Sequence, residues 1–216
     1  MTTLDLFGGP AEGDRDWMGP QAVILRGRAL SCVDELLDAL DAVVAQAPFR
    51  RMVTPGGLTI AVASTNCGAL GWTSDRRGYR YGGLDPAAGR PWPAMPACFA
   101  RLARQAAADA GFPDFEPDAC LINQYLPGTR LSLHQDKNER DFSAPIVSVS
   151  LGMTAIFLFG GLERGDRAFK ASLYHGDVAV WGGDDRLRYH GVMALADAPH
   201  ERLGSQRINL TFRKAG

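Results

Sequence analysis

The sequence predicts a mainly β protein with flanking helices, an α+β chain whose strands form an antiparallel sandwich or jelly roll. From Asp118 onward the chain contains several short runs rich in β-branched and aromatic residues, and no helical run interrupts them. The chain also holds 25 Gly and 13 Pro, which indicates many turns. Because tight turns join antiparallel neighbours, we expect the second half of the chain to supply the sheets.

The first half is expected to hold a mobile arm, a short strand and two helices. The arm covers residues 1–20 and the strand residues 22–25. The first helix is expected over residues 31–46, where Ser31 is a candidate N-cap and apolar residues recur at helical spacing. The second helix is expected over residues 96–110, before a glycine.

Residues 50–93 follow neither the helical nor the strand pattern for most of their length. They hold a strand candidate at residues 58–65 and then many glycines among arginines and aromatic residues. Such a composition is typical of an irregular surface element that carries recognition. The expected organisation is an arm over residues 1–20, an extension with this recognition segment over residues 21–93, and a core over residues 94–216.

The expected strands of the core are short, and Gly-Gly or Pro-Gly turns separate several of them. Short strands of this kind are common in sandwiches. They are expected at residues 119–125, 131–136, 146–151, 155–159, 177–181 and 207–212.

The composition is that of an ordinary globular protein. Hydrophobic residues make up 46% and charged residues 22% of the 216 residues, and the formal net charge is −1. A near-neutral chain is not a globally basic nucleic-acid binder, so any such contact must come from local clusters. The candidate clusters are Arg76, Arg77 and Arg80; Lys137 and Arg140; and Arg164, Arg167 and Lys170.

Nothing in the sequence points to secretion or to a membrane. The N-terminal segment has no basic stretch followed by an apolar run, and no part of the chain approaches the ~18 apolar residues of a membrane span. The four cysteines are far apart and form no Cys-x-x-Cys pattern, which argues against a zinc knuckle or a redox motif. We therefore expect free thiols, a cytoplasmic protein and no membrane partner.

One pair of residues in the core has the spacing of metal ligands. His134 and Asp136 are separated by one residue at the end of an alternating strand, so their side chains point the same way. With one more histidine, for which we choose His190, they form a 2-His-1-carboxylate set that suits non-haem iron(II). The pattern alone is weak, because local hydrogen bonding also explains His-x-Asp pairs. A second such pair, at residues 175–177, includes a glycine at a turn and ranks lower.

The last expected strand places polar side chains on one face. Arg207, Asn209 and Arg213 alternate with apolar residues, and on an edge strand this polar face would simply meet water. In a closed sheet the two arginines would instead clamp a dicarboxylate, since guanidinium groups bind carboxylates in a bidentate manner. Asn123 and Tyr125 can face the same interior. A metal beside such a clamp is what 2-oxoglutarate requires, because its keto acid chelates iron and its far carboxylate needs a cation.

Taken together, many segments of the chain resemble the bacterial AlkB family of iron(II)- and 2-oxoglutarate-dependent dioxygenases. The resemblance spans nearly the whole chain, and its combined specificity is high although each motif alone is short. The core segments that carry it are residues 118–136, 145–152, 159–162, 175–178, 181–183, 189–191 and 209–213. Upstream, the matching segments are residues 49–57, 65–68, 70–72 and 91–96.

The resemblance implies a double-stranded β-helix, or jelly roll, with an N-terminal nucleotide-recognition lid. It implies oxidative repair of N-alkylated bases such as 1-methyladenine and 3-methylcytosine in DNA, with RNA as a further substrate. In that reaction 2-oxoglutarate and O2 become succinate and CO2, and the alkyl carbon leaves as formaldehyde. The implied cofactors are Fe(II), 2-oxoglutarate and O2. The implied partner is alkylated single-stranded DNA, with double-stranded DNA or RNA as alternatives, and no obligate protein partner is implied.

The resemblance also implies a role for individual residues. The implied catalytic iron ligands are His134, Asp136 and His190, and the residues implied around 2-oxoglutarate are Asn123, Tyr125, Arg207, Asn209 and Arg213. Those implied at the nucleic acid are Trp72 over the flipped base, Tyr79 and Thr54 in the lid, and Lys137 and Arg164 at phosphates. Asn138 stands where close relatives usually carry Asp near the base edge, so it keeps an acceptor oxygen but lacks the charge.

Two other functions share some of these features. A jelly-roll dioxygenase that acts on a small molecule or a protein side chain needs the metal and the clamp but no lid. A non-catalytic reader of damaged bases needs the lid, but the intact metal ligands argue against it. The neighbours of Trp72 favour the surface over the core for this residue, because it follows a glycine and precedes Thr-Ser-Asp.

Overall fold

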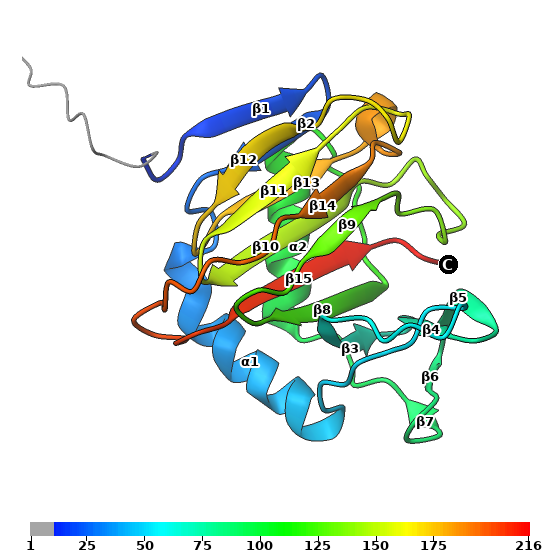
Figure 1. Cartoon of the computed structure of the whole chain (residues 1–216). Coiled ribbons are helices and arrows are strands. Elements are labelled where there is room, and N and C mark those ends of the chain that lie inside the picture. The colour runs from blue at the N-terminus through cyan, green and yellow to red at the C-terminus, as the bar shows by residue number, and fades with distance from the viewer. Residues whose placement is uncertain (1–10) are drawn as a thin grey trace, which may run out of the picture.

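Two antiparallel sheets lie face to face in the computed structural model, which describes residues 11–216 (Figure 1). This arrangement confirms the predicted jelly roll with flanking helices. The larger sheet contains, in spatial order, β1 (Arg15–Gly19), β2 (Ala22–Leu25), β13 (Val178–Trp181), β10 (Ile146–Gly152), β15 (Arg207–Arg213), β8 (Ala119–Tyr125) and β3 (Ala63–Gly68). The smaller sheet contains β12 (Phe169–Leu173), β11 (Ala155–Phe159), β14 (His190–Val192) and β9 (Leu131–His134).

The two faces of the larger sheet differ because β15 alternates between apolar and polar residues. Its apolar side chains are buried in one cluster with α1 (Val33–Gln46) and α2 (Ala97–Asp109). Phe212 of β15, for example, meets Phe99 of α2 edge-on, with 6.0 Å between the ring centroids. The helices therefore cover the apolar face, and the polar face of β15 is left to line the space between the sheets.

A second apolar cluster fills part of the space between the two sheets. Trp181 of β13 lies 5.8 Å from Phe157 and 6.2 Å from Phe159 of β11, measured between ring centroids. Aromatic side chains of this size close the gap between the layers by themselves. The remaining space, next to β15 and β8, is lined by polar side chains and holds the cavity described below.

Two small antiparallel pairs follow β3 in the chain and lie to one side of the sandwich (Figure 1). They are β4 (Gly71–Asp75) with β5 (Gly78–Gly82), and β6 (Leu84–Asp85) with β7 (Arg90–Pro91). Gly78 begins β5 with a φ of 124°, a conformation that favours glycine. The segment expected to be irregular therefore contains an ordered hairpin, which we call the lid hairpin (residues 71–82).

Several predicted boundaries need correction. Residues 15–19, within the expected arm, form β1 and pair with β2, while residues 1–10 of that arm lie outside the described residues. The strand expected at residues 58–65 is β3, which begins at Ala63 and ends at Gly68. Both β1 and β12 are edge strands, and the sequence did not predict them because an edge strand pairs on one side and needs little apolar alternation.

The helices agree with the prediction more closely. The first begins at Val33 instead of Ser31, which lies in a 3-10 turn, and its N-cap is Cys32 without a side-chain hydrogen bond. Ser31 as N-cap was therefore wrong. The second helix, Ala97–Asp109, matches within a residue at each end. Within the described part of the chain, no helix combines the length and the apolar character needed to cross a membrane.

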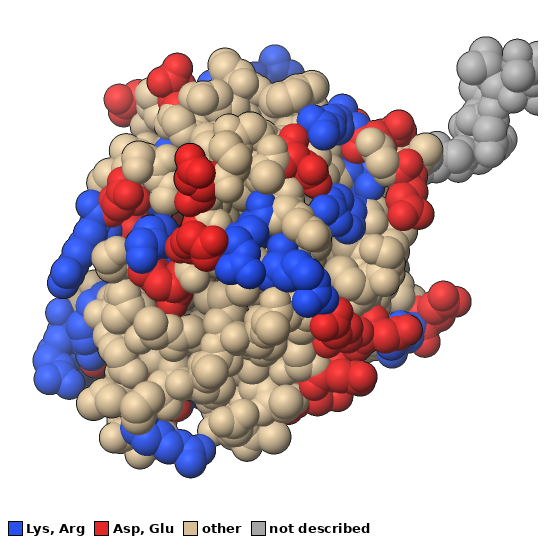
Figure 2. Space-filling view, turned by 180° about the vertical axis from the view of Figure 1, so that it is seen from behind, with Lys and Arg blue, Asp and Glu red and all other residues tan. Residues whose placement is uncertain are grey.

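Acidic and basic side chains lie side by side on the face seen from behind (Figure 2). Arginines of α2 and the residue Arg28 are ion-paired, in the pairs Arg28–Asp109, Arg101–Glu35 and Arg104–Glu116. Arg80, a member of one of the candidate basic clusters, is also paired, with both of its terminal nitrogens on Asp75. Paired arginines offer little to a phosphate, so a nucleic-acid contact is better sought at the cavity.

Candidate active site

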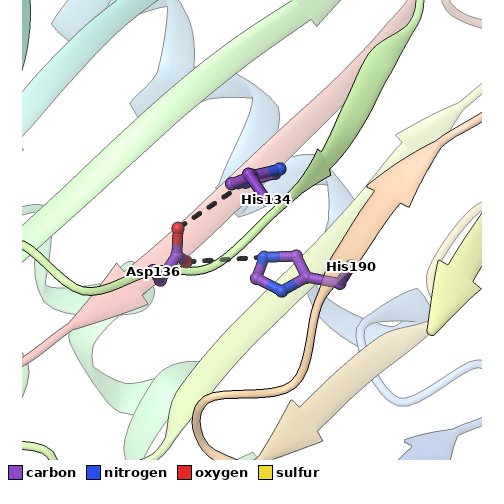
Figure 3. A group of neighbouring side chains, drawn as sticks. All are labelled: His134, Asp136 and His190. Carbon is purple, nitrogen blue, oxygen red and sulfur yellow. Dashed lines mark ion pairs between the residues drawn. The ribbon is translucent and has the colours of Figure 1, made fainter. Parts of the chain in front are cut away.

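The predicted metal ligands converge on one point (Figure 3). His134 ends β9 and His190 begins β14, and these two residues lie directly opposite each other in the β9–β14 pair. Asp136 follows β9 and places Oδ1 3.6 Å from His134 Nε2 and Oδ2 3.7 Å from His190 Nε2. One ligand atom from each residue lies within 4.8 Å of the others, so the three can share a single ion.

Hydrogen bonds from the far side of each imidazole fix its orientation. His134 Nδ1 lies 2.9 Å from the carbonyl oxygen of Ser132, and His190 Nδ1 lies 3.0 Å from that of Arg188. A carbonyl can only accept, so each Nδ1 carries the proton and donates it. Both Nε2 atoms lie on the side of Asp136, and in a neutral imidazole protonated at Nδ1 it is Nε2 that carries the lone pair for a metal.

The charge states of His134 and Asp136 also favour a cation. Burial, together with the neighbouring His190, lowers the pKa of His134 to about 4, so its imidazole is neutral at pH 7. Burial alone would raise the pKa of Asp136, but Arg213 and His190 hold it well below its usual range. Arg213 Nε donates to Asp136 Oδ2 at 2.9 Å. One carboxylate with two imidazoles is the donor set expected for non-haem iron(II).

The polar face of β15 and the adjacent strand β8 form the wall beside these ligands. Arg207 lies opposite Tyr125, and Asn209 lies opposite Asn123. Asn209 Nδ2 donates to Ser148 Oγ at 2.8 Å and to a main-chain carbonyl at 3.0 Å. Asn123 accepts a hydrogen bond from Ser64 Oγ. These amides are held in place by neighbours, so their orientation does not depend on a ligand.

Arg207 is the exception on this wall, because it is buried without enough partners. Its side chain is among the most buried of the protein, at 1% relative exposure, and burial lowers its pKa. One terminal nitrogen donates to Ser150 Oγ at 2.7 Å, and the guanidinium lies 5.0 Å from the centre of the Tyr125 ring. Its Nε and Nη1 atoms are buried and have no hydrogen-bond partner. A guanidinium in this condition is costly unless an anion binds it.

The two arginines of the predicted clamp therefore differ. Arg213 is paired with Asp136 and lies 3.4 Å from Glu139, whereas Arg207 keeps two donors unused. Arg207 is thus the residue available to the far carboxylate of a dicarboxylate ligand. Arg213 acts on the metal carboxylate instead.

One cavity of about 750 Å³ connects the metal ligands, the polar wall and the lid hairpin. This volume is typical of small-molecule sites. All of the site residues predicted from the sequence line it, namely Thr54, Trp72, Tyr79, Asn123, Tyr125, His134, Asp136, Lys137, Asn138, Arg164, His190, Arg207, Asn209 and Arg213.

The lid side of the cavity carries a stacked aromatic pair. The rings of Trp72 and Tyr79 are 5.6 Å apart and nearly parallel, at 13°. Trp72 is only partly buried, so it is not a core residue, and its Nε1 donates to Asn138 Oδ1 at 3.2 Å. Thr54 Oγ1 accepts from the main chain of Leu58 in a turn on the same wall. A flat aromatic surface thus faces the cavity that holds the metal ligands.

The two predicted phosphate contacts, Lys137 and Arg164, line the cavity. Lys137 is exposed, directly after Asp136 in the chain. Arg164 lies 5.2 Å from the centre of the Tyr189 ring. Both leave their charge available to a ligand at the cavity.

Known proteins match along the chain. The sequence profile of the 2OG-Fe(II) oxygenase superfamily matches residues 23–213. The chain is 55% identical to the alpha-ketoglutarate-dependent dioxygenase AlkB of Escherichia coli over 213 residues, which is 99% of this chain and 98% of that protein. The chain belongs to the AlkB family of this superfamily.

Two further matches extend beyond the bacterial proteins. The nucleic acid dioxygenase ALKBH1 of Homo sapiens is 38% identical over 98 residues, which is 45% of this chain and 25% of that protein. The solved structure of OsALKBH1 superposes with a TM-score of 0.81 at 28% identity, covering 93% of this chain and all of that one. The AlkB-type jelly roll is therefore shared by solved structures as well as by sequence relatives.

Membership of the AlkB family makes the chain an iron(II)- and 2-oxoglutarate-dependent dioxygenase, whose reaction requires Fe(II), 2-oxoglutarate and O2. The residues present fit these groups on two structural grounds. The donor set of His134, Asp136 and His190 suits iron(II). The unpartnered donors of buried Arg207 suit the far carboxylate of 2-oxoglutarate.

The second His-x-Asp pair has structural partners, as its turn position predicted. His175 Nδ1 accepts the main-chain N–H of Gly152 at 2.9 Å. Asp177 accepts from the main chain of Gly27 and forms an ion pair with Arg26. These contacts tie the turn to the end of β10 and to the residues that follow β2.

The sequence did not identify three residues that contact the site. Tyr81, Glu139 and Arg186 form a buried group next to Asp136 and Arg213. The only available signals were that Glu139 is close to Asp136 in the chain and that Tyr81 follows Tyr79 by two residues. Both signals are too common to single out a residue.

Proposed function

We propose that this dioxygenase removes N-alkyl groups from nucleic-acid bases, with 1-methyladenine and 3-methylcytosine in single-stranded DNA as the main substrates. Double-stranded DNA and RNA are further substrates in this proposal. The observation that carries it is the stacked pair Trp72–Tyr79, which lines the same cavity as the metal ligands. The human relative ALKBH1, named as a nucleic acid dioxygenase, supports the same substrate class.

The chemistry balances as an oxidation of one carbon. When bound, iron together with O2 and 2-oxoglutarate supplies an oxidant for a C–H bond, and 2-oxoglutarate loses CO2 to become succinate. One oxygen atom of O2 enters succinate, and the other enters the N-methyl group. The resulting N-hydroxymethyl group breaks its N–C bond, and the electrons of that bond stay on the base nitrogen as a lone pair. The carbon leaves as formaldehyde and the hydroxyl proton passes to solvent, so a cationic methylated base becomes neutral.

The residues divide this work between them. His134, Asp136 and His190 hold the metal, and Arg207 binds the far carboxylate of 2-oxoglutarate, with Asn123, Tyr125, Asn209 and Arg213 around it. A base must leave its stack to reach this cavity, so single strands are the least costly substrate.

The nucleic acid contacts the lid side. Trp72 stacks on the target base, a contact worth roughly 1–3 kcal/mol, and a methylated cationic base gains a further attraction to the indole ring. Tyr79, Thr54 and Asn138 complete the base site, and Lys137 and Arg164 contact phosphates. The cytoplasmic location and the lack of an obligate protein partner remain predictions from the sequence.

The test is mass spectrometry of defined methylated oligonucleotides incubated with iron(II), ascorbate and 2-oxoglutarate. We expect the mass to fall by one CH2 per lesion, with formaldehyde released in air and none released without O2. Asp136→Asn serves as the matched variant, because it keeps the side-chain shape but weakens the metal site. A wild-type chain that leaves every methylated oligonucleotide unchanged would refute the proposal.

A further inference from the structure

Glu139 is a buried carboxylate beside the metal ligands, with its side chain 2% exposed. Its Oε1 accepts a hydrogen bond from the Tyr81 hydroxyl at 2.7 Å and lies 3.4 Å from Arg213 Nε. Its Oε2 lies 3.2 Å from Arg186 Nη2 but has no hydrogen bond of good geometry. A carboxylate withdrawn from water in this way is tolerated only because two cations and a hydroxyl surround it.

Both of these cations also hold Asp136. Arg213 Nε donates to the side chain of Asp136 at 2.9 Å, and Arg186 Nη1 donates to its main-chain oxygen at 2.9 Å. The two guanidinium groups are themselves buried, at 5% and 2% exposure. Glu139 is therefore the shared counter-ion of the two groups that fix the metal carboxylate, one through its side chain and one through its backbone.

The Tyr81 hydroxyl connects this group to the lid hairpin. Tyr81 lies directly opposite Trp72 in the β4–β5 pair, so the two side chains are on the same face of the hairpin. Burial raises the pKa of Tyr81 well above its usual value, so the phenol keeps its proton and acts as the donor to Glu139. Tyr81 thus links the hairpin that carries the aromatic surface to the buried group beside the metal carboxylate.

We propose that Glu139 is a positioning residue that sets the metal affinity of the site, and that Tyr81 ties it to the lid hairpin. The two arginines carry two positive charges, and Asp136 and Glu139 carry two negative charges, so the group is neutral before a metal binds. Without the charge of Glu139, one excess positive charge would remain beside the position of a divalent cation. Arg213 would also be free to bind Asp136 more fully, in competition with the metal.

This proposal rests on the proposed metal-binding role of Asp136 and does not depend on which substrate the enzyme takes. Its test is the binding of Mn(II) to the metal-free protein, followed by electron paramagnetic resonance, for wild type, Glu139→Gln and Tyr81→Phe. We expect Glu139→Gln to weaken Mn(II) binding on the order of 10–100-fold, the usual effect of losing a residue that supports metal ligands. Tyr81→Phe should weaken it in the same direction by a smaller factor.

Two matched controls separate this effect from general loss of charge or of a hydroxyl. Glu116→Gln removes a carboxylate that pairs with Arg104, outside the cavity, and Tyr174→Phe removes a hydroxyl from a partly exposed ring outside the cavity. Both should bind Mn(II) as wild type does. The visible spectrum of bound Co(II) should change in Glu139→Gln and not in Glu116→Gln, because only the first alters how Asp136 is held.

A folded Glu139→Gln variant with wild-type Mn(II) affinity and an unchanged Co(II) spectrum would overturn the proposal. If that variant does not fold, Tyr81→Phe decides the question, because it removes one oxygen atom and leaves all charges in place. Wild-type affinity in a folded Tyr81→Phe protein would overturn the link to the lid and, where Glu139→Gln does not fold, the proposal as a whole. The titrations contain no nucleic acid, so an enzyme that proves inactive on methylated oligonucleotides would count against its proposed substrate alone.

Discussion

Replacing Arg207 with Met tests the co-substrate site most directly. Met keeps an unbranched side chain that fills much of the same volume, but it removes the buried guanidinium with its two unpartnered donors. The far carboxylate of 2-oxoglutarate would then lie in a buried site without its cation. Loss of one partner of a buried charge pair costs about 2–5 kcal/mol, which is on the order of 30- to several thousand-fold in affinity.

The stability of the ligand-free protein should change in the opposite direction. Each unpaired buried donor of Arg207 costs about 1–3 kcal/mol, while its hydrogen bond to Ser150 contributes only about 1 kcal/mol. The two donors together cost about 2–6 kcal/mol, so replacement by Met gives a net gain of roughly 1–5 kcal/mol in the free energy of unfolding. For a chain of this length, each kcal/mol of that gain raises Tm by about 2–4 °C.

Calorimetric titration with 2-oxoglutarate and thermal melts of the ligand-free protein measure the two effects separately. The metal is replaced by Mn(II) in the titration so that no turnover occurs. A variant that binds 2-oxoglutarate like wild type would show that Arg207 is not the carboxylate site. A variant that loses the ligand and also melts well below wild type would show that Arg207 supports the fold, and that its free donors are not a cost.

Three further predictions follow from the same cavity. Trp72→Ala should raise the KM for a methylated oligonucleotide about 5- to 150-fold, which corresponds to the roughly 1–3 kcal/mol of lost base stacking. Turnover of 2-oxoglutarate without a nucleic-acid substrate should be retained. If the variant were as active as wild type on the oligonucleotide, a small-molecule dioxygenase would be favoured. Asn138→Asp should raise the ratio of kcat/KM for 1-methyladenine to that for 3-methylthymine about tenfold in paired assays. The reason is that the Trp72 indole N–H occupies the amide oxygen of Asn138, so the Asn138 NH2 group faces the base and repels the amino group of adenine. An unchanged ratio would contradict this. The metal-free protein should lose stability as the pH falls from about 6.5 toward 4. In this range His134 takes up a proton in the unfolded chain but not in the folded protein, where its pKa is lowered to about 4. In thermal melts across this range, the Tm of His134→Asn should fall less with pH than the Tm of wild type.

The parts of the site that the sequence predicted are those set by local geometry. Side chains two residues apart on a strand share a face, so the pairing of His134 with Asp136, and of Arg207 with Asn209, was readable from the chain. The alternation of β15 also predicted which of its faces is apolar. His190 was chosen as the third ligand from the sequence, and the family resemblance implied the same residue. The structure brings all these residues to one cavity.

The parts that the sequence did not predict depend on register and on long-range contacts. The placement of His190 opposite His134 follows from the pairing of β9 with β14, which no local pattern encodes. Glu139 contacts Tyr81, which lies 58 positions earlier in the chain, and Arg186, which lies 47 positions later. The sequence also did not show that Arg213 is paired while two donors of Arg207 have no partner, because such pairing depends on the folded structure.

The proposed ligands of the co-substrate are divided between the two layers of the sandwich. The histidines belong to the smaller sheet, and Arg207 belongs to the larger one. A molecule of 2-oxoglutarate bound at both places would connect the two layers. Succinate keeps the carboxylate that Arg207 would hold but has no keto acid to chelate the metal. The product would therefore connect the two layers less firmly than the co-substrate.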